Sequence, residues 1–182
     1  MALKDYIEKK PVITTDRLTL RPLRREDVPA LQEWMPDKEL YTYWGKGPGK
    51  TDRQPELLFA KPEKPSKSFH LGIALNEDRK VIGELWVYLI ENDRMAKLAV
   101  RIGKGWQGQG YATEAVNAMV EFCFTHTELK RIWTDADVRN LASCRVLENC
   151  GFTREGTIRQ GKMVSTWCDY HLYGILKEDL HL

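Results

Sequence analysis

The sequence predicts one mixed α/β domain over residues 1–182, built from several strands, a glycine-rich turn and a few amphipathic helices. Short segments in which apolar and polar residues alternate indicate the strands. After the glycine-rich turn the apolar residues instead recur at i, i+3, i+4 and i+7, as on one face of a helix. No internal repeat and no linker-like stretch divides the chain, and its length is ordinary for a single domain.

Composition and charge exclude several classes of protein. Hydrophobic residues make up 42% of the chain and charged residues 30%, as in an ordinary globular domain. The formal net charge of +2 lacks the excess of lysine and arginine found in phosphate-backbone binders, so we expect no direct nucleic-acid binding. The chain has no signal-like apolar segment and no run of about 18 apolar residues, so we expect a cytoplasmic protein without a membrane partner.

The cysteines carry no metal or redox signature. Cys123, Cys144, Cys150 and Cys168 lack CxxC spacing and lie in apolar-periodic stretches. We therefore expect buried, reduced thiols and no metal site.

The first half of the chain contains four strand-like segments and one clear helix. The strands are expected near 15–21, 69–75, 81–89 and 96–102, and the polar turn 76–79 joins the second and third into a hairpin. The helix begins near Glu26, carries a proline in its first turn and buries Val28, Leu31 and Met35. In the fourth strand, alternation places Leu98, Val100 and Ile102 on one face and Lys97, Ala99 and Arg101 on the other.

The segment 36–68 differs from the rest of the chain. Prolines and glycines interrupt any long periodicity there, which leaves only a short helical candidate near 56–59. We expect this segment, called the flap below, to be a functional loop or helical cover rather than core.

The second half begins with the turn Gln107-Gly108-Gln109-Gly110-Tyr111-Ala112. The helix after it has its apolar stripe at Ala112, Ala115, Val116, Met119 and Cys123. A strand is expected over 131–137, and Asn140 can cap a helix that runs to about Asn149 and ends at Gly151. Two strands, near 153–159 and 167–176, complete the chain.

A glycine turn before a helix can bind an anion or can simply be a tight connection. The first turn of a helix offers unpaired N–H groups and the positive end of the helix dipole, and glycine lets a phosphate approach closely. Other phosphate motifs fit poorly. The sequence has no Gly-x-x-x-x-Gly-Lys-Ser/Thr, and Thr113 stands where a dinucleotide fingerprint would have its last glycine.

Two ordered motifs resemble the GNAT acetyltransferases. The turn 107–112 is similar to the Gln/Arg-x-x-Gly-x-Gly/Ala signature of that family, and 140–152 resembles its Asn-x-x-Ser/Ala…Gly-Phe segment. The stretches 15–23 and 169–173 are similar to the ribosomal-protein N-terminal acetyltransferase (RimJ/RimL-type) branch of bacterial, cytoplasmic enzymes. The resemblance implies the GNAT fold, a central twisted mixed sheet of about seven strands flanked by about four helices, with acetyl-CoA as cosubstrate.

The resemblance also implies roles for particular residues. The expected acetyl-CoA contacts are the backbone of Val100 and Ile102 along the pantetheine arm, the turn Gln107, Gly108, Gln109, Gly110, Tyr111 and Ala112 with Thr113 at the pyrophosphate, and Asn140 and Ser143. The segment 36–68 would face the acceptor. Its lysines argue against a polycationic acceptor, which would prefer an acidic cleft.

The catalytic residues are less clear than the cofactor site. Many relatives protonate the leaving thiolate with a tyrosine, but that position here is Leu147. Ser143 is the expected substitute, either as a donor or as a spacer that lets CoA pass. Lys97 and Lys162 stand where relatives carry carboxylates. Glu84 is therefore the candidate general base, or else a structural carboxylate.

The apparent lack of a strong base favours one kind of acceptor. At pH 7, deprotonating an α-amine costs roughly 1 kcal/mol and deprotonating a lysine side chain roughly 4.6 kcal/mol. We expect acetyl transfer by direct attack in a ternary complex to a protein N-terminus, by a monomer or homodimer. The alternatives are a small amine or an aminoglycoside as acceptor, and a CoA-binding module without turnover.

Overall fold

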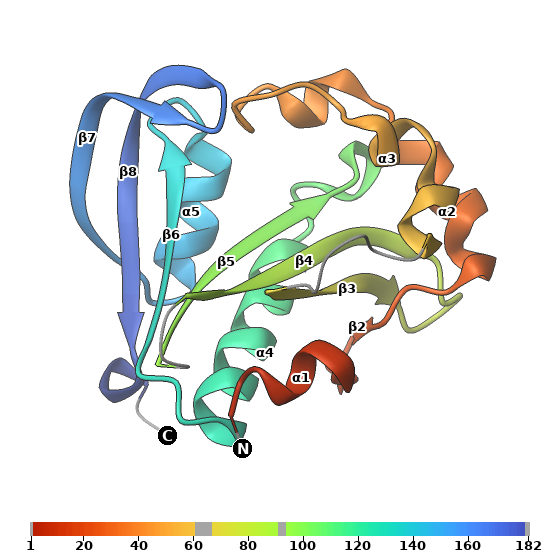
Figure 1. Ribbon diagram of the computed structural model, residues 1–182, viewed down its shortest axis with the longest axis horizontal. Helices are drawn as coiled ribbons and strands as arrows, with labels where there is room; N and C mark the ends of the chain where they lie inside the picture. The colour runs from red at the N-terminus through yellow and green to blue at the C-terminus, as the bar shows by residue number, and fades with distance from the viewer. Residues whose placement is uncertain (1, 61–66, 91–93, 181–182) are drawn as a thin grey trace.

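The computed structural model describes residues 2–60, 67–90 and 94–180 and contains one mixed sheet with helices on both faces (Figure 1). The sheet order is β1-β2-β3-β4-β5-β6-β8-β7. The strands are β1 (Ile13–Thr14), β2 (Leu18–Arg21), β3 (Ser68–Leu75), β4 (Val81–Ile90), β5 (Met95–Ile102), β6 (Arg131–Asp137), β7 (Thr153–Met163) and β8 (Thr166–Leu176). The helices are α1 (Asp5–Glu8), α2 (Val28–Trp34), α3 (Lys50–Arg53), α4 (Tyr111–His126) and α5 (Leu141–Asn149), with 3-10 turns at η1 (Arg25–Asp27), η2 (Lys38–Tyr41), η3 (Pro55–Phe59), η4 (Lys104–Trp106) and η5 (Lys177–Asp179).

The mixed α/β prediction is confirmed, with differences at both edges of the sheet. The segment expected as one strand over 15–21 is a small hairpin, because the Thr15 N–H donates to the Leu18 carbonyl at 2.8 Å and β1 folds back on β2. This hairpin gives the described part of the chain eight strands rather than about seven. At the other edge β7 extends to Met163, since irregular pairing between Ile158 and Gly161 lets the strand continue beyond residue 159.

The central feature is a fork between β5 and β6. β5 pairs with β4 along its whole length, from Met95–Ile90 to Ile102–Gly83. With β6 it makes only three parallel pairs, of which the last joins Lys97 to Trp133. Beyond that pair the two strands separate, as Figure 1 shows, and β6 continues against β8 to Asp137. We call the gap beyond Lys97 and Trp133 the fork. Its β5 edge carries backbone groups that an extended ligand can pair with.

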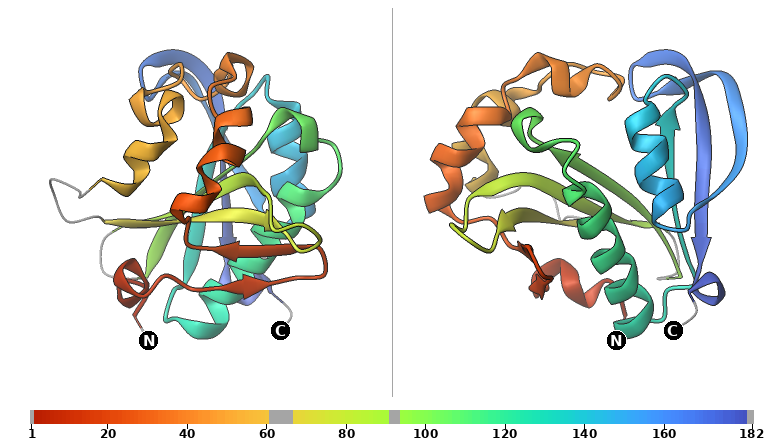
Figure 2. Two further views of the ribbon diagram at one scale, coloured as in Figure 1. Left: turned by 90° about the vertical axis from the view of Figure 1, so that its right-hand side faces the viewer. Right: turned by 180° about the vertical axis from the view of Figure 1, so that it is seen from behind.

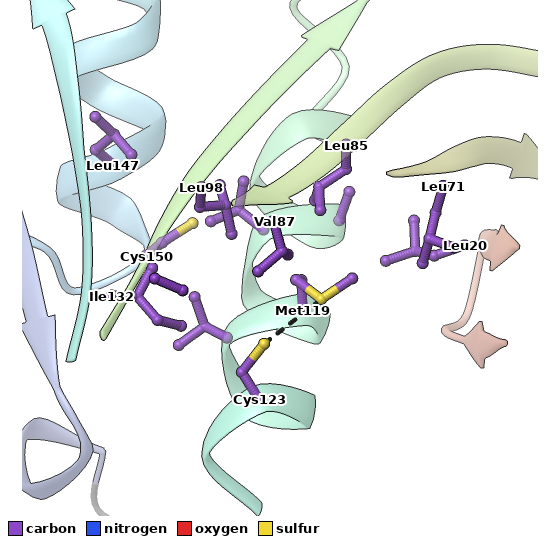
Figure 3. Close-up of a cluster of buried hydrophobic side chains, with 14 of the residues drawn as sticks. Leu20, Leu71, Leu85, Val87, Leu98, Met119, Cys123, Ile132, Leu147 and Cys150 are labelled. Carbon is purple, nitrogen blue, oxygen red and sulfur yellow. Dashed lines mark hydrogen bonds between the residues drawn. The ribbon is translucent and has the colours of Figure 1, made fainter. Parts of the chain in front are cut away.

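One face of the sheet rests on α4. Leu85, Val87 and Leu98 point toward Met119 of this helix (Figure 3), and Figure 2 shows α4 crossing the back of the sheet. The expected stripe of α4 is buried at Ala115, Val116, Met119 and Cys123, whereas Ala112 in the first turn is only half-buried. The four cysteines are all buried and unpaired.

The other face lies under the flap. Leu31, Trp34 and Met35 of α2 and the adjoining turn pack on Ala74 and Val81 in a second, smaller core cluster. Val28, expected to be buried, is only half-buried and is not part of this cluster. The two faces of β5 therefore look toward different parts of the molecule, as its alternation predicted.

Candidate active site

The turn before α4 has the conformation that its glycines predict. Gly108 has φ +75° and Gly110 φ +81°, in the left-handed region that glycine adopts without strain. A Cβ at Gly108 would meet no atom within 4 Å, so its role is conformational, and the space beside it is open. Among the residues that the structure describes, no acceptor is recorded for the N–H groups of Gly108, Gln109 and Gly110. Such free donors at a helix start fit a phosphate.

Arg17 braces this turn from the first hairpin, a contact that the sequence analysis missed. Its Nη1 donates to the Gln109 carbonyl at 3.0 Å and its Nε to Glu114 at 2.7 Å, while the guanidinium lies 4.5 Å from the Tyr111 ring centre. Although burial opposes it, hydrogen bonds from Thr15 and Arg17 hold the pKa of Glu114 below its usual range. The turn therefore has a cation beside it and a fixed attachment to β2.

The other expected cofactor residues surround the fork. Ile102 is buried and Val100 half-buried, and the Gln107 side chain donates to the Ile102 carbonyl at 2.9 Å. Asn140 caps α5 by accepting the Ser143 N–H at 3.1 Å, which leaves the NH2 group of Asn140 for another partner. Helices α4 and α5 each follow one of the diverging parallel strands, and ligands of open α/β sheets bind at this carboxyl edge.

A buried ionic cluster occupies the flap side of the sheet. Arg101 donates to Glu84 at 2.9 and 2.6 Å, to Asp52 of α3 at 2.8 Å and to the Tyr41 hydroxyl at 2.6 Å. Four rings surround its guanidinium at 5.1–5.7 Å, those of Trp34, Tyr41, Trp44 and Trp86. Arg101 thereby fastens the flap to the sheet.

Glu84 is engaged at both carboxylate oxygens. Besides the Arg101 contacts, its Oε1 lies 2.8 Å from His70 Nε2, and its residue exposure is 0%. Burial alone would raise the pKa of Glu84, but His70 and Arg101 together lower it. Burial would likewise raise the pKa of Asp52, but Arg101, Tyr41 and the Gly49 N–H together lower it. A carboxylate so enclosed is suited to holding the flap and the sheet together.

The vertex of the fork carries a second ion pair. Lys97 Nζ donates to Asp135 Oδ2 at 2.6 Å and lies 4.9 Å from the Trp133 ring centre. Further along β6, both oxygens of Asp137 accept from Arg139, at 2.9 and 2.6 Å.

The flap also touches the C-terminal hairpin. The Gly45 carbonyl accepts from the Ser165 N–H at 3.2 Å, from the Thr166 hydroxyl at 2.9 Å and from the Ser165 hydroxyl. The Tyr43 ring lies 5.7 Å from the Arg139 guanidinium. The flap therefore reaches from the β4–β5 side of the fork to the β7–β8 side (Figure 1).

The structure thus groups the sequence-predicted residues in two places. The turn 107–112, Val100, Ile102, Asn140 and Ser143 border the fork, whereas Glu84 lies in the ionic cluster beneath the flap. The sequence analysis missed Arg101, Asp52, His70 and Asp135 as members of polar clusters. The available signal for the Arg101 cluster was that Glu84 and Arg101, two charged residues, stand opposite each other on neighbouring strands. Leu147, at the position of the family tyrosine, is buried in the core.

A metal site and a membrane-spanning helix are both absent from the described part of the chain. It contains no group of three or more His, Cys, Asp or Glu side chains placed to hold a metal ion. None of its helices has the length and apolar character that crossing a membrane would require.

A splayed pair of parallel strands with a glycine turn at its end is the arrangement of a GNAT-type acyltransferase. Residues 17–153 match the family model described as "Acetyltransferase (GNAT) domain", and the chain belongs to this family of acetyl-CoA-dependent N-acetyltransferases.

Individual relatives agree on the family, and one of them is named for its acceptor, spermidine. The chain is 31% identical over 144 residues to the Probable N-acetyltransferase YjcK of Bacillus subtilis, covering 78% of this chain and 76% of that one. It is 28% identical over 145 residues to the Spermidine N(1)-acetyltransferase of Vibrio cholerae, covering 77% and 81%. A crystal structure of a GNAT acetyltransferase from Bacillus anthracis aligns with TM-score 0.80 and 23% identity over 92% of this chain and 99% of that one.

Proposed function

We propose that this enzyme acetylates the α-amine at a protein N-terminus, as the resemblance to the ribosomal-protein branch implies. The observation that carries the proposal is the internal pairing of the carboxylates on the flap side of the sheet. Glu84 and Asp52 share Arg101, Asp135 is paired with Lys97, and Asp137 with Arg139, so three cations engage four carboxylates. Carboxylates engaged in this way attract a polycation less than free carboxylates would, whereas a single amine does not require that attraction.

The cofactor half of the proposal rests on the fork. Acetyl-CoA would place its pyrophosphate on the turn 107–112, where no acceptor is recorded for the N–H groups of Gly108, Gln109 and Gly110. Thr113 and Arg17 would lie near it, and the pantetheine arm would run along the β5 edge at Val100 and Ile102. The NH2 group of Asn140 would bind the same arm from α5. Acetyl-CoA supplies the thioester, so the protein must position an amine, stabilise an oxyanion and manage two protons.

Proton delivery to the leaving thiolate is assigned to Ser143. It is half-buried in the first turn of α5, beside the Asn140 cap. Its hydroxyl would donate directly or through a water molecule, and the positive end of α5 would favour the thiolate. Glu84, the base candidate from sequence, is better suited to support, because neither of its oxygens is free of a hydrogen bond and its pKa is lowered.

A polyamine is the second candidate acceptor, favoured by the similarity to a spermidine acetyltransferase. The experiment follows release of free CoA thiol with acetyl-CoA and a panel of acceptors. The panel contains two peptides, spermidine and an aminoglycoside. The first peptide has a free N-terminus. The second is the same peptide with its N-terminus acetylated and an internal lysine added. The proposal predicts release with the free N-terminus alone. Preferential turnover of spermidine or the aminoglycoside would replace it.

A further inference from the structure

We propose that Asp135 is the general base that removes the proton from the attacking amine, and that Lys97 positions it. The inference rests on the proposed function because it requires that an amine is acetylated, but it does not depend on which amine is the acceptor. Asp135 was not among the residues that the sequence suggested.

Asp135 occupies the right place on the fork. Lys97 and Trp133 form the last β5–β6 pair, and two residues further along each strand stand Ala99 and Asp135. These two positions therefore face each other across the point where the strands part. The Lys97 contact at 2.6 Å places the Asp135 carboxylate on the same face of β5 as Lys97, which is the face under the flap. In the proposed complex the acceptor would approach from that face, while the thioester would lie along the β5 edge.

Asp135 is also available for proton transfer. Its side chain is 22% exposed, and among the described residues no donor is recorded for its Oδ1. The small side chain of Ala99 leaves room opposite it. The other carboxylates nearby lack this freedom. Glu84 is engaged at both oxygens and fully buried, and both oxygens of Asp137 bind Arg139.

His70 is the remaining rival. It stacks on Trp86 and is held by Glu84, but it lies on β3, with β4 between it and β5. At about 4.8 Å per strand, two strand spacings separate its backbone from the β5 edge. Asp135 lies on the neighbouring strand of the fork itself. Geometry therefore favours the aspartate.

The proposed step conserves atoms and charge. The neutral amine attacks the thioester carbonyl carbon, a C–N bond forms, and the carbonyl oxygen becomes an oxyanion. The nitrogen, now positively charged, gives one proton to Asp135 Oδ1 directly or through one water molecule. The C–S bond then breaks, the carbonyl re-forms, and the CoA thiolate takes a proton from the Ser143 hydroxyl, directly or through one water molecule. Asp135 later returns its proton to solvent, and solvent returns a proton to Ser143.

Lys97 acts through Asp135 rather than on the substrate. Its ammonium holds Oδ2, which leaves Oδ1 directed away from the ion pair, and its contact with Trp133 limits its own freedom. A charge-assisted hydrogen bond of this kind fixes a carboxylate in one orientation. Lys97 is therefore a positioning residue.

The test compares Asp135→Asn, Asp135→Ala and Lys97→Met with the control Asp78→Asn, which changes an exposed aspartate in the β3–β4 turn. Each variant is assayed for kcat, for acetyl-CoA affinity by calorimetry and for thermal stability. We expect Asp135→Asn to lower kcat about 100- to 10,000-fold, with acetyl-CoA affinity within about threefold of wild type. Added formate should restore part of the activity of Asp135→Ala. It should not restore any of the activity that Lys97→Met loses.

Several results would overturn the assignment. A kcat for Asp135→Asn within threefold of wild type would exclude a base role, and so would a lowered kcat that formate cannot rescue in Asp135→Ala. Loss of acetyl-CoA affinity together with a lower Tm would make the residue structural. Failure of the proposed acceptor is a separate result, because it appears in the wild-type acceptor panel and leaves the comparison of variants intact with whichever amine is turned over.

Discussion

Arg101 Nη2 lies 2.6 Å from Glu84 Oε2, and this ion pair is almost completely closed to solvent, with side-chain exposures of 6% and 1%. The pair sits between the sheet and the flap, where Asp52 and Tyr41 complete it. A buried pair contributes modestly to stability while intact, but removing one partner leaves an uncompensated charge. The expectations for this cluster follow from that asymmetry.

Arg101→Met should lower the free energy of unfolding by about 3–5 kcal/mol, because it strands two buried carboxylates. Denaturant titration measures the change. Adding Glu84→Gln should recover part of the loss, since one of the stranded charges is then removed. Equal stability of Arg101→Met and wild type would show that the cluster has no role in holding the flap.

The same cluster predicts how stability depends on pH. The folded-state pKa of Glu84 is lowered, so its contribution is fully present above the unfolded-state pKa of about 4.3 and is lost as pH falls through the lower folded value. The stability difference between wild type and Glu84→Gln should therefore be constant above about pH 5 and shrink below about pH 4. Denaturant midpoints at pH 7, 5, 4 and 3 measure this. A difference that grew on acidification would contradict the assigned direction.

The contribution of Arg17 to cofactor binding can be measured separately from its effect on catalysis. Arg17→Met removes the contacts to Gln109 and Glu114, and we expect KM for acetyl-CoA to rise about tenfold, or about 1.4 kcal/mol, with kcat within about twofold. Arg159→Met, at an exposed position of β7, is the control. A fall in kcat as large as the rise in KM would mean that Arg17 contributes to catalysis as well as to cofactor binding.

The glycines of the turn give a matched pair of variants. Gly108→Ala and Gly110→Ala each force a side chain into left-handed backbone, at about 1–2 kcal/mol. A Cβ at Gly110 would also lie 3.4 Å from Arg17 Nη2, whereas one at Gly108 meets nothing. Acetyl-CoA affinity, measured by calorimetry, should therefore fall in both variants. Unchanged affinity in both would remove the phosphate role of this turn.

Ser143→Ala tests the proton donor. We expect kcat to fall about 10- to 1,000-fold with acetyl-CoA affinity nearly unchanged, as for one acid–base participant. Stopped-flow measurement of thiol release gives kcat directly. An unchanged kcat would reduce Ser143 to a spacer that lets the cofactor pass.

Features that depend on local backbone could be predicted from the sequence better than features that depend on tertiary contacts. The glycine spacing at 107–112 predicted a tight turn before a helix, and Gly108 and Gly110 have the left-handed backbone of such a turn. Phosphate binding at this turn stays a prediction. The Arg101 cluster joins residues 41, 52, 84 and 101 through tertiary contacts alone. Asp135 was hidden in the same way, because its relation to Lys97 depends on the short β5–β6 register.

The fork has a consequence for how this enzyme can diverge. Along β5, residues 98, 100 and 102 face α4, while 97, 99 and 101 face the flap. Lys97 and Arg101 are held by ion pairs with Asp135 and Glu84, whereas Ala99 lies between them with no such partner. One inserted residue in this strand would exchange the two sets. We therefore expect descendants of this chain to vary at 99 while keeping Lys97, Arg101 and the length of β5 constant.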